Sequence, residues 1–268
     1  MQTQMLSKSF VMAAATMLLM SGCGTLDLRP TTHRTSPTSE QVKRGRSLLK
    51  KMEQAHGASV FRSKSTLPLN VDDDWSMAPF PLNLRIPFGT EKQSYVLEMA
   101  PKAETSLAFS SGTLDGETWA VGDNGQGIRR INGAQVESED EASIRRTVQS
   151  LAFFFQAPFM LNDADVVFDL GEETFDEKIY ERVFISWGTA EPQDDVDQFI
   201  AWIEKDTSHL AYLEHTLRSF VKSRSGVVAY RDHRSVDGVV IAHEVTSVDG
   251  VGGPPKIHQM KVRSVQSD

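Results

Sequence analysis

Cysteine is nearly absent from this sequence. Cys23 is the single cysteine among 268 residues, so no disulfide can form within the chain. The stability of the fold must then come from a buried apolar core. Apolar residues make up 40% of the chain. A chain of this length buries about 70% of its unfolded surface, so such a core is available.

Long apolar runs and dense basic clusters are also lacking. The run Phe10–Met20 is too short to cross a bilayer as a helix, and no second run approaches the ~20 residues that a crossing requires. The formal net charge is −8, and beyond the modest cluster Lys43–Lys51 there is no block of basic residues. Because phosphate binding depends on Lys and Arg contacts, nucleic acid is not expected as a partner.

The common catalytic and ligand-binding motifs are missing. There is no His-Glu-x-x-His helix, no Gly-x-Ser-x-Gly turn and no phosphate-binding loop, and the seven histidines show no metal-ligand spacing. The acidic runs Asp72–Asp74 and Asp194–Asp197 lack the glycine and the bidentate glutamate of an EF-hand, and we predict that both are solvated loops. We therefore predict no catalytic residues, no metal site and no cofactor.

The first residues carry a targeting signal. Lys8 precedes the apolar run, and the small residues Ser21 and Gly22 precede Cys23. The segment Leu19-Met20-Ser21-Gly22-Cys23 resembles a bacterial lipobox. The resemblance implies cleavage before Cys23 and acylation of that residue, and several acyl chains together hold a protein stably on a membrane. An ordinary signal peptide followed by an incidental cysteine is the alternative.

These signals set the expected domain organisation. Residues 1–22 form the signal peptide, residues 23–38 form the lipidated cysteine and a flexible tether rich in Thr, Ser and Pro, and residues 39–268 form the folded domain. Gly24, in place of an aspartate after the cysteine, points to the outer membrane under the enteric sorting rule. We expect a lipid-anchored protein of the cell envelope that faces the periplasm.

Two amphipathic helices are predicted. Thr38 and Gln41 fit a capping box, and apolar residues then recur at helical spacing over residues 39–56. Ser138 and Glu141 fit a second capping box, and a similar spacing predicts a helix over residues 139–156 that Pro158 stops.

Short apolar runs separated by turn residues fill most of the remaining domain and predict an antiparallel meander. The predicted strands are 67–71, 82–86, 95–99, 106–109, 118–121, 127–131, 166–170, 177–187, 198–205, 210–218, 227–232, 239–248 and 257–265. In the later strands apolar residues occupy both faces, which indicates a sheet covered on one side and curved around something on the other.

Aromatic residues gather at the end of the second predicted helix and in the strands that follow. One interpretation is that they plug the core, because buried aromatics mostly do so. The functional interpretation is that they line an apolar cavity. The candidate lining residues are Phe153, Phe154, Phe155, Phe159, Trp187 and Trp202.

Three stretches resemble the lipoprotein-carrier family of LolA and LolB, which includes the outer-membrane lipoprotein-sorting proteins. They are Leu48–Gly57, with its His-Gly end, the hairpin Phe199–Arg218, and Tyr230–Val239. The resemblance covers about Ser39 to Val265 and implies an α+β fold. In that fold a strongly curved antiparallel sheet, an unclosed half β-barrel, has about two helices covering its concave side and holds an apolar ligand. The acidic segment Glu191–Asp197 has no counterpart in the family.

The sequence thus favours a non-enzymatic, membrane-anchored lipoprotein that binds a lipid, an acyl chain or a lipidated protein in an apolar cleft. Two alternatives stay open. The domain could instead be an interaction module that docks on an envelope protein without a ligand, or a hydrolase built on the same sheet.

Overall fold

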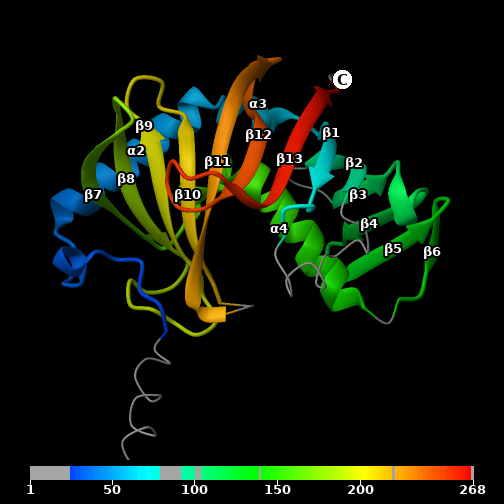
Figure 1. The fold of residues 1–268 in the computed structure, drawn as a ribbon, viewed down its shortest axis with the longest axis horizontal. Helices are drawn as coiled ribbons and strands as arrows, with labels where there is room; N and C mark the ends of the chain where they lie inside the picture. Colours follow the sequence, from blue (N-terminus) through cyan, green and yellow to red (C-terminus); the bar gives the residue numbers. More distant parts are fainter. Residues whose placement is uncertain (1–24, 79–91, 100–103, 139, 219–220, 267–268) are drawn as a thin grey trace, which may run out of the picture.

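The computed structural model describes residues 25–78, 92–99, 104–138, 140–218 and 221–266. Within them, 13 strands form one antiparallel sheet in the order β6-β5-β4-β3-β2-β1-β13-β12-β11-β10-β9-β8-β7. Since β6 and β7 are its two edges, the sheet does not close, and the predicted unclosed half-barrel is confirmed (Figure 1). The strands are β1 (Leu67–Asp74), β2 (Lys92–Met99), β3 (Thr105–Phe109), β4 (Glu117–Val121), β5 (Gly127–Ile131), β6 (Ala134–Val136), β7 (Val166–Phe175), β8 (Lys178–Ser186), β9 (Gln198–Glu204), β10 (Leu210–Leu217), β11 (Val221–Val236), β12 (Val239–Val248) and β13 (Pro255–Val265).

Each strand other than β6 overlaps a predicted one, although β7 and β11 extend well beyond the predicted 166–170 and 227–232. Strand β6 was not predicted, because its three residues are too few to form a pattern. The predicted strand at 82–86 lies outside the described residues.

The helices are α2 (Ser39–Ala55), the short α3 (Ala58–Ser63) and α4 (Glu141–Met160). The predicted capping box at the start of α2 is confirmed, since the Thr38 hydroxyl accepts from the Gln41 N–H and the Gln41 side chain accepts from the Thr38 N–H. Helices α2 and α4 lie on the concave side of the sheet. There α2 packs on β7 and β8, and α4 crosses β2 to β5 and reaches β12.

Two details predicted for α4 are wrong. Its N-cap is Asp140, whose carboxylate accepts from the Ser143 N–H, and not Ser138. Pro158 does not stop the helix but lies in its last turn. A proline removes one backbone donor there, yet the helix continues because the N–H of Leu161 still donates to the carbonyl of Ala157.

The main apolar core lies between the concave face and the helices. A second, smaller cluster lies on the outer face of β7 to β10. Its buried members are Phe168, Leu170, Tyr180, Phe184, Ile200 and Trp202. Two of the chain's own segments pack on it, since Leu28 comes from the N-terminal segment and Val251 from the loop between β12 and β13, which crosses in front of β10 and β11 in Figure 1.

The imidazole of His56 connects the end of α2 to one end of the sheet. His56 follows α2 and is only 1% exposed. Its Nδ1 atom lies 2.9 Å from the carbonyl oxygen of Val240, and its Nε2 atom accepts from the Leu210 N–H at 3.1 Å. The end of the sheet that carries the start of β10 and of β12 is therefore closed by the end of α2. We call it the capped end.

The N-terminal segment is held against the domain, which differs from the free coil expected for residues 24–38. The Leu28 N–H donates to Gln198 Oε1 at 2.9 Å, and Arg218 donates to the Leu26 carbonyl. Arg29 is 6% exposed and forms a 3.0 Å ion pair with Asp27. A composition rich in Thr, Ser and Pro gave no sign of these specific contacts.

In the part of the chain that the structure describes, no helix has both the length and the apolar character needed to cross a membrane.

Candidate functional site

A cluster of aromatic rings lies on the concave side at the end of the sheet opposite the capped end. This end carries the end of β8, the start of β9 and the end of β10, because neighbouring strands are antiparallel. We call it the open end. The rings, which we call the aromatic cluster, are Phe153 and Phe154 of α4, Trp187 after β8, Phe199 of β9 and His215 of β10.

The rings of the aromatic cluster contact one another in a continuous chain. The Phe153 centroid lies 5.3 Å from Phe199 and 6.3 Å from Trp187, and the Phe154 centroid lies 5.6 Å from His215. Most of these contacts are edge-on or tilted, which is the usual favourable arrangement of aromatic pairs. Phe153, Phe154 and Trp187 are only partly buried, so the cluster presents apolar surface at the open end.

The electrostatics of the aromatic cluster favour an uncharged surface. Burial lowers the pKa of His215, whose Nδ1 atom lies 3.0 Å from the carbonyl oxygen of Thr216. The imidazole is therefore neutral at pH 7 and acts as one more ring of the cluster.

The structure separates the six predicted lining residues into three groups. Phe153, Phe154 and Trp187 belong to the aromatic cluster. Phe155 and Phe159 are 4% and 2% exposed and belong to the packed core, where Phe159 stacks on Phe61 at 4.3 Å. Trp202 lies on the outer face of the sheet. A period of two along β9 places Phe199 on one face and Trp202 on the other.

A cluster of polar side chains lies at the same open end, on strands β13, β1 and β2 and directly after β1. Its members, which we call the polar cluster, are Asp73, Trp75, Gln93 and His258. Asp73 Oδ1 lies 2.7 Å from His258 Nε2, and the Trp75 ring stacks on His258 with 4.0 Å between centroids. The Tyr95 hydroxyl donates to Asp73 Oδ2 at 3.1 Å. Burial and the Asp73 carboxylate raise the pKa of Tyr95 well above its usual range.

Sequence reasoning missed the polar cluster because it treated Asp72–Asp74 as a solvated loop, and that prediction is wrong. These residues are the last three of β1, and Asp73 is 1% exposed. The alternation of Leu67, Leu69 and Val71 with polar residues places Asp73 on the buried face, and this period of two was the signal that could have found it.

The second acidic run also makes specific contacts. Asp197 Oδ1 accepts from the Thr216 hydroxyl at 2.6 Å and from the Arg218 N–H at 3.0 Å. Asp194 accepts from the Thr25 hydroxyl at 2.6 Å. The acidic segment Glu191–Asp197 thus joins the N-terminal segment to β10 next to the aromatic cluster.

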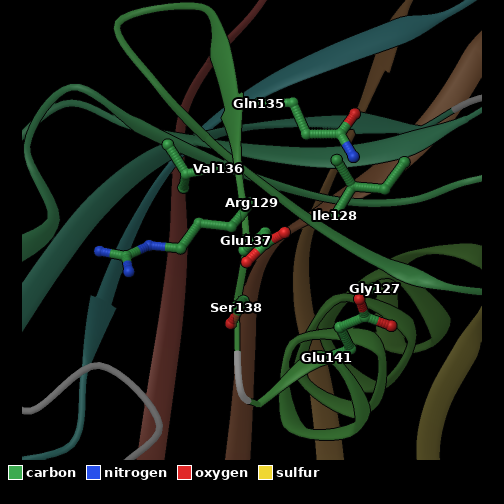
Figure 2. A pocket seen from close by; sticks show the side chains of 8 residues that line it. All are labelled: Gly127, Ile128, Arg129, Gln135, Val136, Glu137, Ser138 and Glu141. Carbon is green, nitrogen blue, oxygen red and sulfur yellow. The ribbon is translucent and has the colours of Figure 1, made fainter.

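A separate cavity of about 360 Å³ lies between β5, β6 and the start of α4 (Figure 2). It is lined by Gly127, Ile128, Arg129, Gln135, Val136, Glu137, Ser138 and Glu141. Its lining is largely polar, and Arg129 is already paired with Glu117 at 2.5 Å. None of the predicted lining residues belongs to it, so it is not the predicted apolar cleft.

The histidine and acidic side chains do not form a metal site in the described part of the chain. No group of three or more His, Cys, Asp or Glu side chains within the described ranges could hold a metal ion. His56, His209 and His233 have ring centroids 4.7 to 5.4 Å apart, but both nitrogens of His56 are engaged by backbone groups. These hydrogen bonds stabilise the fold, and neither nitrogen of His56 is available to bind a metal or another ligand.

Comparison with known proteins identifies the fold. No family model matches the chain, and none of the curated proteins matches its sequence. Among solved structures, a DUF1329 family protein from Desulfovibrio piger matches with a TM-score of 0.55 at 10% identity, over 85% of this chain and 93% of its own. A LolA superfamily protein from Nitrosomonas europaea matches with a TM-score of 0.51 at 9% identity, over 84% and 93%. A putative outer membrane lipoprotein-sorting protein domain from Vibrio parahaemolyticus matches with a TM-score of 0.50 at 7% identity, over 84% and 92%.

The chain therefore has a LolA-like fold, as the resemblance implied. At these identities the match concerns the fold alone and carries over no residue's role.

Proposed function

We propose that this chain is a membrane-anchored envelope lipoprotein that binds an acyl chain, of a lipid or of a lipidated protein, at the open end of its concave face. The observation that carries the proposal is the aromatic cluster, whose rings Phe153, Phe154 and Trp187 are only partly buried between α4 and the sheet. An apolar surface of this kind, next to a helix that crosses a half-barrel, suits a flexible hydrocarbon chain.

The driving force is removal of apolar surface from water. Burial contributes about 25 cal/mol for each Å² of apolar area, and part of this gain offsets the immobilisation of the ligand. The neutral His215 adds no charge that an acyl chain would have to desolvate. Phe155 and Phe159 are part of the packed core, so we infer that they hold α4 in place. The ligand would contact Phe153, Phe154 and Trp187.

The contacts of the N-terminal segment favour a position of this site close to the membrane. The Thr25 hydroxyl is bonded to Asp194, in the acidic segment that follows Trp187. Cys23 is two residues before Thr25, and two residues span at most about 7 Å. A lipid on Cys23 would then hold the open end, with its aromatic cluster, towards the membrane surface. Anchoring at the outer membrane is part of this proposal.

The similar structures agree with this function at the level of the fold. One of the solved structures is described as a lipoprotein-sorting domain and another as a LolA superfamily protein. A hydrolase has less support. The His258 ring contacts Asp73 and Trp75, neither of which supplies the hydroxyl or thiol nucleophile that acyl transfer requires.

Native mass spectrometry tests the proposal. The chain from Gly24 onward keeps every described helix, strand and contact, and is purified from cells and measured before and after organic extraction. We expect a co-purified lipid mass that extraction removes. The Phe154→Asp variant should lose it, and the Phe175→Asp variant should keep it. Phe175 is the matched control because it is 39% exposed at the end of β7, away from the aromatic cluster.

Two results would contradict the proposal. One is a protein that carries no lipid and takes up none from phospholipid or lipopeptide, which would favour an interaction module. The other is equal lipid retention by the folded Phe154→Asp and Phe175→Asp variants.

A further inference from the structure

Three neighbouring strands change from apolar to polar at the same level of the concave face. Along β1 the buried residues are Leu69, Val71 and then Asp73. Along β2 they are Leu97, Tyr95 and then Gln93, and along β13 they are Val262, Met260 and then His258. The register pairs Asp73 with both Gln93 and Met260, so the polar positions adjoin one another. The apolar core under these three strands thus ends at the polar cluster.

Three of the four residues of the polar cluster are almost fully buried, and the cluster is incompletely hydrogen bonded. Asp73, Gln93 and His258 are 1%, 2% and 7% exposed. Among the described residues, Gln93 Oε1 and Trp75 Nε1 have no hydrogen-bond partner. The Asp73 Oδ1 and His258 Nε2 atoms lie 2.7 Å apart, but their approach lacks the geometry of a hydrogen bond. Buried polar groups are paired in most native structures, and each unpaired one costs free energy. A cluster of unpaired buried polar groups is therefore a candidate ligand-binding site.

The free atoms specify the chemistry of that ligand. Trp75 Nε1 is a donor and needs an acceptor, while Gln93 Oε1 is an acceptor and needs a donor. A hydroxyl group supplies both. An anionic head group is disfavoured, because the polar cluster contains the buried Asp73 carboxylate and no lysine or arginine.

We propose that the polar cluster binds an uncharged, hydroxyl-bearing group, such as a glyceryl group, at the end of the acyl chain held by the concave face. This inference rests on the proposed function and adds the class of head group. The polar cluster and the aromatic cluster lie at the same open end, on strands at opposite sides of β12 and β11. The two clusters together would accept a ligand with one apolar and one polar part.

Competition binding against a fluorescent fatty-acid probe tests the inference, with the delipidated chain from Gly24 onward. The ligands are 1-oleoylglycerol, methyl oleate and oleoyl lysophosphatidic acid, which share the acyl chain. Methyl oleate has no donor, and the lysophosphatidic acid adds a phosphate. We expect 1-oleoylglycerol to bind about tenfold more tightly than methyl oleate, the worth of one or two buried hydrogen bonds.

The variant Trp75→Phe isolates the polar contact. It removes the indole N–H and keeps an aromatic ring for stacking on His258. The preference for 1-oleoylglycerol should fall about threefold or more, and binding of methyl oleate should not change. Trp119→Phe is the matched control, because that indole already donates to Glu117 Oε2 at 3.1 Å on β4. It should keep the full preference.

The possible results distinguish the head-group inference from the proposed function. Equal affinity for 1-oleoylglycerol and methyl oleate would overturn the inference and leave the proposed function standing. Tighter binding of the lysophosphatidic acid would overturn the uncharged head group. An unchanged preference in Trp75→Phe would overturn the role of the polar cluster. Failure of all three lipids to bind would remove the proposed function and the inference with it.

Discussion

The Nε2 atom of His56 accepts a hydrogen bond from the backbone N–H of Leu210, which lies 154 residues further along the chain. The Nδ1 atom faces the carbonyl oxygen of Val240, so the ring carries its proton there and is neutral. One imidazole thus joins the end of α2 to β10 and β12. The His-Gly end of the first helix therefore has a structural role, because His56 connects the helix to the sheet.

The stability of the protein should fall in mild acid because of this ring. Burial, together with the smaller effect of the nearby His233 and His209, lowers the pKa of His56 from 6.5 to about 3. The unfolded chain binds a proton near pH 6.5 that the folded chain rejects, so the contribution is complete above pH 6.5 and is lost as the pH falls towards 3. Between pH 6.5 and 5 the free energy of unfolding should drop by about 2 kcal/mol from His56 alone.

Urea denaturation at pH 7.5, 6 and 5 measures this effect. His56→Gln should be less stable than the wild type at pH 7.5 and should lose less stability on acidification. A His56→Gln variant whose stability falls as steeply as that of the wild type would show that another group is responsible.

The residue after His56 provides a second prediction. Gly57 has a φ of +73°, and a side chain there would overlap the carbonyl oxygen of Gly238. Gly57→Ala should therefore lower the free energy of unfolding by about 3 kcal/mol or more. Gly125 has the same φ but nothing within 4 Å of an added Cβ, so Gly125→Ala should cost only about 1 kcal/mol of backbone strain. Similar losses in the two variants would refute the close approach.

The sequence predicts the sheet well because short apolar runs end at turn residues, such as Asp237-Gly238 after β11 and Asp249-Gly250 after β12. It predicts α2 because the capping box and the apolar spacing agree. It could not place Trp202, since both faces of β9 are apolar and the pattern cannot tell the core face from the outer one. The period of two along β1 could have placed Asp73 on the buried face, but not the polar cluster as a whole, because Asp73, Gln93 and His258 are adjacent only after the register of three strands is set.

The outer position of Trp202 predicts a purely structural effect of its substitution. Its Nε1 atom donates to Glu214 Oε1 at 2.5 Å, and burial raises the pKa of Glu214. Trp202→Phe should destabilise the fold by about 1 to 2 kcal/mol and leave lipid retention unchanged. Phe199→Leu, on the same strand but within the aromatic cluster, is the comparison and should reduce retention. Loss of lipid from a folded Trp202→Phe protein would contradict this assignment.

The N-terminal segment should contribute to stability through Arg29. Its side chain is 5% exposed and is bonded to Asp27, so Arg29→Ala should cost about 1 to 3 kcal/mol and open residues 25–38 to proteolysis. Arg34 lies 3.7 Å from Asp27 with its side chain 54% exposed, and Arg34→Ala should cost less than about 0.5 kcal/mol. Equal protease resistance of the wild type and Arg29→Ala would show that these contacts do not hold the segment.

The most direct test of the central claim is to locate a bound acyl chain. The chain from Gly24 onward is loaded with a fatty acid that carries a photoreactive diazirine, irradiated, digested and analysed by mass spectrometry. We predict labelling of the peptides that contain Phe153, Phe154 and Trp187. Labelling confined to the outer face around Trp202 and Tyr212, or labelling that excess 1-oleoylglycerol does not reduce, would contradict an acyl-chain site on the concave face.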